Sequence, residues 1–593
     1  MIRTPLRPLA RILKARDQGQ NPDSIEAENI RLRNEADRDH DRNRAEGRLL
    51  VMGIAFFCAF LVIGTRMGML AGSVPEEPIA QASGSPIVGQ RSDIVDRNGR
   101  VLATNLDTHS LYAQIPDMID PAKAARDLAA IFPELEEDDL LKDFIGERRF
   151  LWIRREISPE QMQAVHDIGD PGLLFGPREM RLYPNGSVAA HILGGATYGR
   201  EGVHSAEVIG VAGVEKYFDD FLRDPANEGA PLELSIDLTV QAASERVLQG
   251  GMMLMSAKGA SSVLMDVHTG EIISMVSLPD FDPNDRPRIL TEGDQSDSVL
   301  FNRALQGVYE LGSVFKIFAV SQAIELGLIE AGTMIDTSGP LTWGRFRIRD
   351  FHDYGPELSA ENVIVESSNI GTARIAMMIG ADRQREFLGT LGLLLETPVE
   401  MVEAPTGDPL LPANWSEIST MTISYGHGLS SSPVHLATAY ASLLNGGYRV
   451  EPTIVRQDGP RRGPRVVSEQ VSAAARDMLR AVVVRGTASF GDVVGYNVGG
   501  KTGTADKPRP SGGYYDDRTI ATFASVFPAN DPRYVLIVTL DEPSVEALGE
   551  QRRTAGWTAV PVAAEMIRRV APLLGMRPDV ETLTPTGVSL TSN

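Results

Sequence analysis

The chain has 593 residues with 57 basic and 79 acidic side chains, which gives a formal net charge of −22. At an average of about 150 residues per domain, this length predicts two to four domains with ample core. The acidic balance argues against nucleic-acid binding. With one cysteine, Cys58, and nine histidines that show no HExxH spacing, the sequence predicts no disulfide, no metal site and no cofactor.

An uncharged, apolar stretch lies near the N-terminus. Residues 49–65 carry no charge, and residues 67–71 extend the stretch past Arg66, so we expect a single transmembrane helix over 49–71. Residues 1–48 hold 11 basic side chains and residues 72–90 hold none, which predicts a cytoplasmic N-terminus and an exported body. The alternative is a cleaved signal peptide, against which the 48 residues before the stretch, rich in charged and polar side chains, argue. We expect a tail over 1–48 and a linker over 72–88, which is rich in Pro, Gly, Ser and Ala.

Two further regions carry strand patterns. Residues 90–103 read as a hairpin that turns at Asn98-Gly99, with its charged side chains on a solvated face. In the second region, four apolar segments predict strands at 261–265, 271–276, 519–527 and 533–540, and residues 561–574 predict a closing amphipathic helix. Strands at both ends of a helical middle predict an α+β fold with one antiparallel sheet flanked by helices.

Three short motifs follow one another in the second region. Ser313 and Lys316 lie three residues apart before an apolar run, so a helix start would place a nucleophile and a base on one face. Ser367-Ser368-Asn369 follows, and then Lys501-Thr502-Gly503-Thr504. Each motif alone is weak. The ordered set of serine-x-x-lysine, serine-x-asparagine and lysine-threonine-glycine is typical of penicillin-binding proteins and related serine enzymes.

The chain resembles the class B penicillin-binding proteins. Besides the three motifs, the resemblance rests on segments 150–155, 181–184 with 191–194, and 210–215, which lie in the family's order. It implies a non-catalytic pedestal of the dimerisation type over 89–230, a penicillin-binding transpeptidase domain over 231–576 and a flexible tail over 577–593. Segments 426–430, 443–447, 501–505 and 554–557 resemble the cell-division type, FtsI, whereas the elongation type shares the core motifs.

The resemblance also implies roles for the motif residues. Ser313 would be the nucleophile and Lys316 its proton acceptor, Ser367 would relay the proton to the leaving D-alanine, and Asn369 would orient the substrate amide near Lys316. Lys501, Thr502 and Thr504 would hold the terminal carboxylate, Gly503 would let the substrate approach, and the amides of Ser313 and Thr504 would form the oxyanion hole. We expect Lys501 to lie on an edge strand, where an extended peptide can pair with the backbone.

These expectations describe a peptidoglycan D,D-transpeptidase of the inner membrane, with its catalytic domain in the periplasm, that cross-links stem peptides at the division septum and is a β-lactam target. The implied partners are stem peptides, β-lactams, the membrane, a polytopic SEDS-type (FtsW-type) glycosyltransferase and other division proteins. Two alternatives remain open: a hydrolase, either a D,D-carboxypeptidase or a β-lactamase, and a non-enzymatic scaffold or β-lactam sensor.

Overall fold

The computed structural model describes residues 7–19, 21, 23, 25, 27, 28, 31, 50–65, 91–202, 205–344, 346–509 and 512–579. The chain divides into two units, Met1–Pro78 and Ile79–Asn593, and each is described here by itself. The predicted linker over 72–88 lies outside the described residues, and so do positions 66–71 of the predicted membrane segment and 580–593 of the predicted tail.

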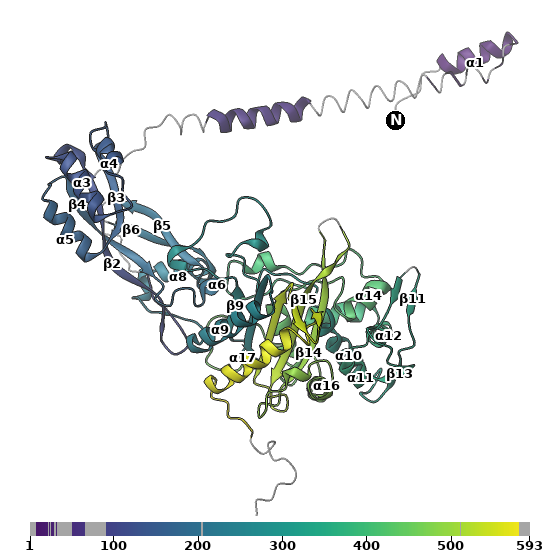
Figure 1. Ribbon diagram of the computed structural model, residues 1–593. Coiled ribbons are helices and arrows are strands. Elements are labelled where there is room, and N and C mark those ends of the chain that lie inside the picture. Colours follow the sequence, from purple (N-terminus) through teal and green to yellow (C-terminus); the bar gives the residue numbers. More distant parts are fainter. Residues whose placement is uncertain are drawn as a thin grey trace, which may run out of the picture. The chain divides into compact units, whose positions relative to one another are not determined.

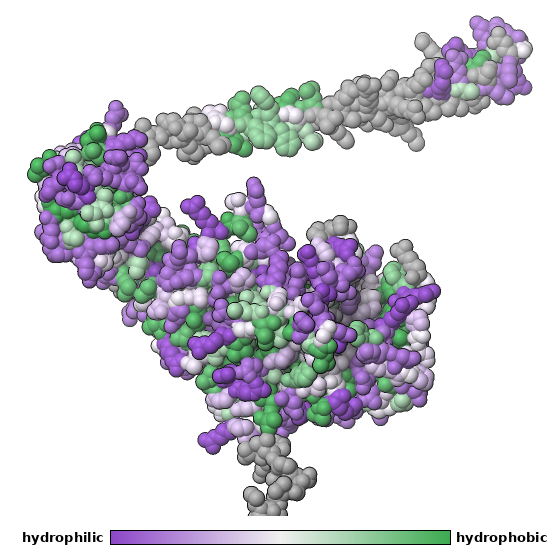
Figure 2. Space-filling model, viewed as in Figure 1, coloured by the Kyte–Doolittle hydropathy of each residue, from purple (hydrophilic) through white to green (hydrophobic). Residues whose placement is uncertain are grey.

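The first unit contains helix α1 (Arg7–Asp17) and a second helical stretch over residues 50–65. Its apolar side chains are exposed along this stretch, and Phe56, Phe57 and Phe60 are each more than half accessible (Figure 2). Among the helices that the structure describes, none is both long and apolar enough to cross a membrane. The membrane helix over 49–71 therefore stays a prediction.

A five-stranded sheet forms the first part of the second unit (Figure 1). Strands β3 (Phe150–Ile157) and β4 (Leu173–Leu182) both pair antiparallel with the long β2 (Val101–Gln114), which also pairs with β1 (Ile94–Val95). β1 continues to β7 (Leu232–Glu233) in parallel. Helices α3 (Pro121–Ile131), α4 (Glu137–Phe144) and α5 (Pro159–Ile168) supply apolar faces to a small core with this sheet. The hairpin predicted at Asn98-Gly99 is confirmed, with φ +78° at Gly99.

Two of the five charged side chains in residues 90–103, Arg91 and Asp96, are buried, which contradicts the expected solvated face for these two. Arg91 is 3 % exposed and Asp96 is 1 % exposed. The Arg91 guanidinium donates to Glu215, itself 0 % exposed, and to Asp219. Asp96 accepts from the Arg100 amide and also from the Leu238 amide, which opens helix α9 (Leu238–Leu254). Pairing is what allows these charges to be buried, so the segment braces the fold.

The second part is built on an antiparallel sheet of order β14-β15-β16-β8-β9. Its strands are β14 (Gly499–Pro508), β15 (Tyr514–Phe527), β16 (Tyr534–Asp541), β8 (Gly259–Asp266) and β9 (Ile272–Leu278). All four predicted strands and the predicted antiparallel sheet are confirmed, with bounds that shift by a few residues. β14 lies at the edge, as expected for the strand that carries Lys501.

Helices cover both faces of this sheet, which is why every residue of β16 is buried. α9 and α17 (Ala559–Leu573) lie side by side and contact the sheet (Figure 1). The helix predicted over 561–574 is α17. α15 (Pro433–Leu444), buried along its whole length, contacts β8, β15 and β16. α16 (Glu469–Arg485) packs on β14 and on α10 (Lys316–Glu325).

The remaining helices carry the first two motifs. α10 contacts α11 (Ala360–Val365), α12 (Asn369–Ile379), α13 (Ala381–Thr390) and α14 (Glu417–Ser424). Short strand pairs lie beside them: β10 (Met334–Asp336) with β13 (Glu357–Ser359), and β11 (Leu341–Trp343) with β12 (Phe346–Ile348). The first eight residues of α10 are all buried, so the predicted buried helix after Ser313 is confirmed.

Candidate active site

Ser313 lies in a 3-10 turn, Gly312–Phe315, that runs directly into α10. Lys316 is the first residue of α10, so the two side chains are one turn apart, as the spacing predicts. Ser313 is partly exposed, whereas Lys316 is 0 % exposed. The turn is held from behind by α15, because the Tyr440 hydroxyl donates to the Val314 carbonyl oxygen at 2.8 Å. The segment from Ser313 to Lys316 is therefore held in place by the buried side chains of Tyr440 and Lys316.

Three glycines let backbone segments close around this turn. A Cβ on Gly426 would lie 2.0 Å from the Gly312 carbonyl oxygen, and one on Gly312 would lie 2.8 Å from the Thr504 carbonyl oxygen. A Cβ on Gly503 would lie 2.2 Å from the Leu311 carbonyl oxygen. Gly503 was expected to make room for the substrate. Its missing side chain also lets β14 pack against the turn that carries Ser313, and its role toward the substrate stays a prediction.

The three motifs meet at the hydroxyl of Ser367. Lys316 Nζ lies 3.0 Å from Ser367 Oγ and also donates to the Ser367 carbonyl oxygen. Lys501 Nζ lies 2.9 Å from the same Oγ. Among the described residues, the hydrogen bonds of Lys316 Nζ all end at Ser367, and none reaches Ser313. The serine between the two amines is the point where a proton can pass from one motif to another.

Burial lowers the pKa of both amines. It lowers the pKa of Lys316 well below its usual value, the Lys501 cation lowers it further, and Asp350 opposes the change. Burial alone lowers the pKa of Lys501 to about 7. Since the amines share Ser367 Oγ, their titrations are linked. At least one of them is therefore readily deprotonated near neutral pH, which a proton acceptor requires.

The backbone of Ser367 is in the left-handed region, with φ +64°. A residue with a Cβ is uncommon there, and such strain gathers at functional sites. The next residue, Ser368, is fully buried and caps α12, because its Oγ accepts from the Gly371 amide at 2.9 Å. Its side chain therefore serves the start of this helix.

Asn369 is the first residue of α12. Its side-chain amide donates to the Arg349 carbonyl oxygen at 2.9 Å. No hydrogen bond joins it to Lys316 in the part of the chain that the structure describes. The expected role in orienting the substrate amide therefore stays a prediction.

Hydrogen bonds within the protein hold the hydroxyls of both threonines of the third motif in place. Thr504 Oγ1 accepts from the Ala555 amide at 3.0 Å, so its proton remains available to an incoming anion. Thr502 Oγ1 lies 2.7 Å from Thr487 Oγ1, in the loop after α16. Lys501 Nζ also donates to the Thr502 carbonyl oxygen at 3.1 Å. Two hydroxyls and one amine are thus fixed along one edge of the sheet.

Sequence reasoning missed two residues that support this site, Asp350 and Thr487. Asp350 accepts from Ser368 and from the first amides of α12. Both lie in loops without a recognisable spacing to the motifs, so no local signal could have identified them. Within the described residues, no group of three or more His, Cys, Asp or Glu could hold a metal ion.

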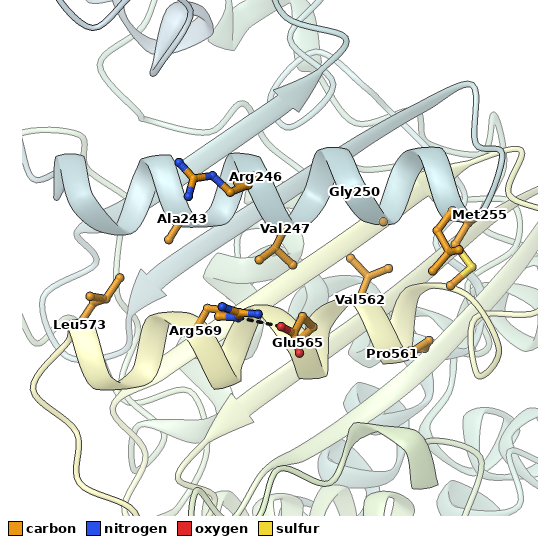
Figure 3. Close-up of a pocket in the computed structure, with 12 residues that line it drawn as sticks. Ala243, Arg246, Val247, Gly250, Met255, Pro561, Val562, Glu565, Arg569 and Leu573 are labelled. Atoms are coloured by element: carbon orange, nitrogen blue, oxygen red, sulfur yellow. Dashed lines mark hydrogen bonds and ion pairs between the residues drawn. The ribbon is translucent and has the colours of Figure 1, made fainter.

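A separate groove of about 520 Å³ lies between α9 and α17 (Figure 3). Its walls are mainly apolar, with Val247, Met255 and Val562 in view, while Arg569 pairs with Glu565 at its rim. None of its lining residues belongs to the three motifs, so we assign it no part in the acyl-transfer site.

Comparison with known proteins gives this site its context. The penicillin binding protein transpeptidase domain family matches residues 260–567, and the penicillin-binding protein dimerisation domain family matches residues 86–228. A probable peptidoglycan D,D-transpeptidase FtsI of Caulobacter vibrioides is 36 % identical over 568 residues, which cover 92 % of each chain. The peptidoglycan D,D-transpeptidase FtsI of Escherichia coli K12 is 27 % identical and covers 83 % of this chain and 85 % of its own.

Solved structures of a penicillin-binding protein are also similar to this chain. Penicillin binding protein 3 of Mycobacterium tuberculosis in complex with aztreonam superposes with a TM-score of 0.62 at 26 % identity, and covers 83 % of this chain and 97 % of its own. The same protein in complex with ampicillin gives the same score and identity. The chain therefore belongs to the class B penicillin-binding proteins, with a dimerisation domain followed by a transpeptidase domain. Within that class it is a peptidoglycan D,D-transpeptidase of the FtsI type, a serine enzyme of cell division.

Proposed function

We propose that Ser313 forms the acyl-enzyme and that Lys316 accepts its proton. The observation that carries the proposal is the convergence of two fully buried amines, Lys316 and Lys501, on Ser367 Oγ at 3.0 and 2.9 Å. A buried pair of amines cannot both remain charged at low cost. A neutral Lys316, one turn from a partly exposed serine, is suited to activate it.

The reaction then follows in two halves. Ser313 Oγ attacks the carbonyl carbon of the penultimate D-alanine while its proton passes to Lys316 Nζ. Ser367 returns a proton to the leaving nitrogen, the C–N bond breaks, and D-alanine departs. Lys316 Nζ then reprotonates Ser367, which leaves the amine neutral again. The amine of a second stem peptide attacks the carbonyl carbon of the ester and gives its proton to Lys316, the bond from that carbon to Ser313 Oγ breaks, Lys316 returns the proton to Ser313 Oγ, and the cross-link is an amide. The amides of Ser313 and Thr504 are proposed to stabilise the oxyanion in each half.

Substrate binding is assigned to β14. An extended stem peptide can pair with the free edge of this strand, and Thr502, Thr504 and Lys501 are suited to its terminal carboxylate. Gly503 supports the assignment by keeping β14 against the nucleophile's turn. Asn369 is proposed to hold the substrate amide from the opposite side. A β-lactam, which mimics the D-alanyl-D-alanine terminus, would enter the same position.

Around this enzyme we propose the expected organisation of the chain. Residues 49–71 anchor it in the inner membrane, with residues 1–48 in the cytoplasm and the domains over 89–230 and 231–576 in the periplasm. The exposed apolar side chains of residues 50–65 support the anchor. A transpeptidase needs nascent glycan beside it, so we propose a polytopic SEDS-type glycosyltransferase as partner at the septum.

The direct test is labelling of the full-length protein with a fluorescent penicillin, followed by mass mapping of the modified peptide. We expect one adduct, on Ser313, and no labelling of the Ser313→Ala protein. A matched control is Ser321→Ala, because Ser321 is a buried serine two turns further along α10. An adduct on Ser367 or on any other residue would refute the assignment.

A further inference from the structure

Asp350, in the loop between β12 and β13, places both carboxylate oxygens on the start of α12. Oδ1 accepts from the Asn369 amide at 2.5 Å and from the Ile370 amide at 3.0 Å. Oδ2 accepts from Ser368 Oγ at 2.6 Å. Ser368 Oγ in turn accepts from the Gly371 amide. The first three amides of the helix are therefore all satisfied by these two side chains.

The start of α12 has two capping side chains, Asp350 and Ser368, where one is usually sufficient. A single Ser, Thr, Asp or Asn normally caps a helix start, and Ser368 already does so. The second acceptor comes from 18 residues earlier in the chain and ties the cap to another loop. The residue fixed between this double cap and α11 is Ser367, whose left-handed backbone, at φ +64°, is strained for a residue with a side chain. Such a conformation persists only when its surroundings hold it.

The carboxylate also belongs to the electrostatic environment of the amines. It favours the charged form of Lys316, against burial and against Lys501 on β14. The other charged or titratable groups near it are Glu366, at the end of α11, and the loop residues Arg349, His352, Asp353 and Tyr354. Asp350 is the one that contacts the Ser367–Asn369 turn through its side chain.

We propose that Asp350 is a positioning residue for acyl transfer: it fixes the turn that presents Ser367 Oγ to the two buried lysines, and its carboxylate lies close enough to Lys316 to act on that amine. This inference rests on the proposed roles of Lys316 and Ser367. Asp350 itself need not touch the substrate. Its contribution is to hold Ser367 Oγ where both amines reach it, and to keep Lys316 from losing its proton at too low a pH.

The loop offers a matched control. Asp350 and Asp353 line the same cavity of about 550 Å³, together with His352. Asp353 Oδ1 accepts from the Gly355 amide at 3.0 Å, within its own loop. Asp353→Asn therefore removes the same charge from the same cavity without touching α12. His352→Gln, which removes the imidazole from the same cavity, is a second control.

The experiment measures the acylation rate constant of the full-length protein with a chromogenic β-lactam between about pH 5 and 9, together with Tm. For Asp350→Asn we expect a plateau at least about tenfold lower. Loss of the carboxylate removes the group that favours charged Lys316, so the midpoint of the acidic limb should move to lower pH. Ser368→Ala keeps the carboxylate, and should lower the plateau without moving the midpoint. Asp353→Asn and His352→Gln should change neither.

The outcomes separate this inference from the proposed function. Wild-type rates and midpoint in Asp350→Asn, with Ser313→Ala and Lys316→Ala inactive, would overturn only the inference. A rate that falls in step with Tm while the midpoint stays fixed would identify a purely structural cap and overturn it as well. If Asp350→Asn fails to fold, a full acylation rate in Ser368→Ala would overturn the positioning role. Acylation that survives in Ser313→Ala would instead refute the proposed function.

Discussion

Lys501 Nζ lies 2.9 Å from Ser367 Oγ, although the two residues are 134 positions apart in the chain. The contact joins the edge strand of the sheet to the turn before α12. Lys501 is 0 % exposed, and burial lowers its pKa to about 7. Its charge near neutral pH is therefore adjustable, and it acts directly on Lys316, whose pKa it lowers.

Replacing Lys501 by methionine should slow acylation by at least about tenfold and move the acidic limb of the pH profile upward. The direction follows from the charge: without the neighbouring cation the pKa of Lys316 rises, so its neutral form is reached only at higher pH. This is opposite to the shift expected for Asp350→Asn. The measurement is the acylation rate constant against pH.

Lys507→Met is the matched control, because Lys507 lies on the same strand and pairs with Asp541 and Glu542 at 2.7 and 2.8 Å. It should leave the profile unchanged. A Lys501→Met profile that kept its midpoint would show that the two amines do not titrate together.

Gly426 and Gly428 provide a second test, since both have a left-handed backbone, at φ +83° and +80°. An alanine Cβ at Gly426 would lie 2.0 Å from the Gly312 carbonyl oxygen, whereas at Gly428 the nearest atom is Thr422 Oγ1 at 3.5 Å. Backbone strain is thus similar in the two variants, at about 1–2 kcal/mol. Only Gly426→Ala should displace the turn that carries Ser313.

We expect Gly426→Ala to reduce acylation at least about tenfold and Gly428→Ala to lower Tm with little effect on the rate constant. Acylation kinetics and thermal unfolding of both proteins are the measurements. Equal rates in the two variants would mean that the approach of Gly426 to Gly312 does not position the nucleophile.

The elements with strong local patterns could be predicted from the sequence. The apolar segments of β8, β9, β15 and β16 indicated their strands, and Asn98-Gly99 indicated its turn. The motif order indicated which side chains meet, although they come from α10, the turn before α12 and β14. The charge on the hairpin could not be placed, because burial of Arg91 depends on Glu215 and Asp219, more than 100 positions away.

The residues that support the site could not be identified from the sequence either. Asp350 and Thr487 act through loops whose path is set by tertiary packing. The close approach of β14 to the turn that carries Ser313, which Gly503 permits, likewise becomes visible only once the fold is known. Local spacing identifies chemistry within one element, whereas contacts between distant loops require the structure.

Thr487→Val should weaken acylation about two- to tenfold. The variant removes the hydroxyl that holds Thr502 Oγ1 at 2.7 Å, and a net hydrogen bond contributes about 0.5–1.5 kcal/mol. Thr539→Val is the control, because Thr539 pairs with Thr522 at 3.1 Å inside the same sheet and both are buried. It should lower Tm only. Equal acylation rates in the Thr487→Val and Thr539→Val proteins would refute the role of Thr487 in holding Thr502.

Replacing Glu215 by alanine should destabilise the pedestal by about 3–5 kcal/mol, because it would leave Arg91 and Arg181 buried without their shared carboxylate. The measurement is urea unfolding of the full-length protein, followed through both domains.

Glu233→Ala provides the contrast, since its pair with Arg456 is about half exposed and should contribute at most about 1 kcal/mol. At low temperature the folded fraction of Glu215→Ala should still acylate at Ser313, because among the described residues no ion pair or hydrogen bond joins a charged pedestal side chain to the three motifs. Loss of partner binding in such a variant would therefore report unfolding of the pedestal, not a lost contact. A stability within 1 kcal/mol of wild type would show that the buried cluster does not brace the domain.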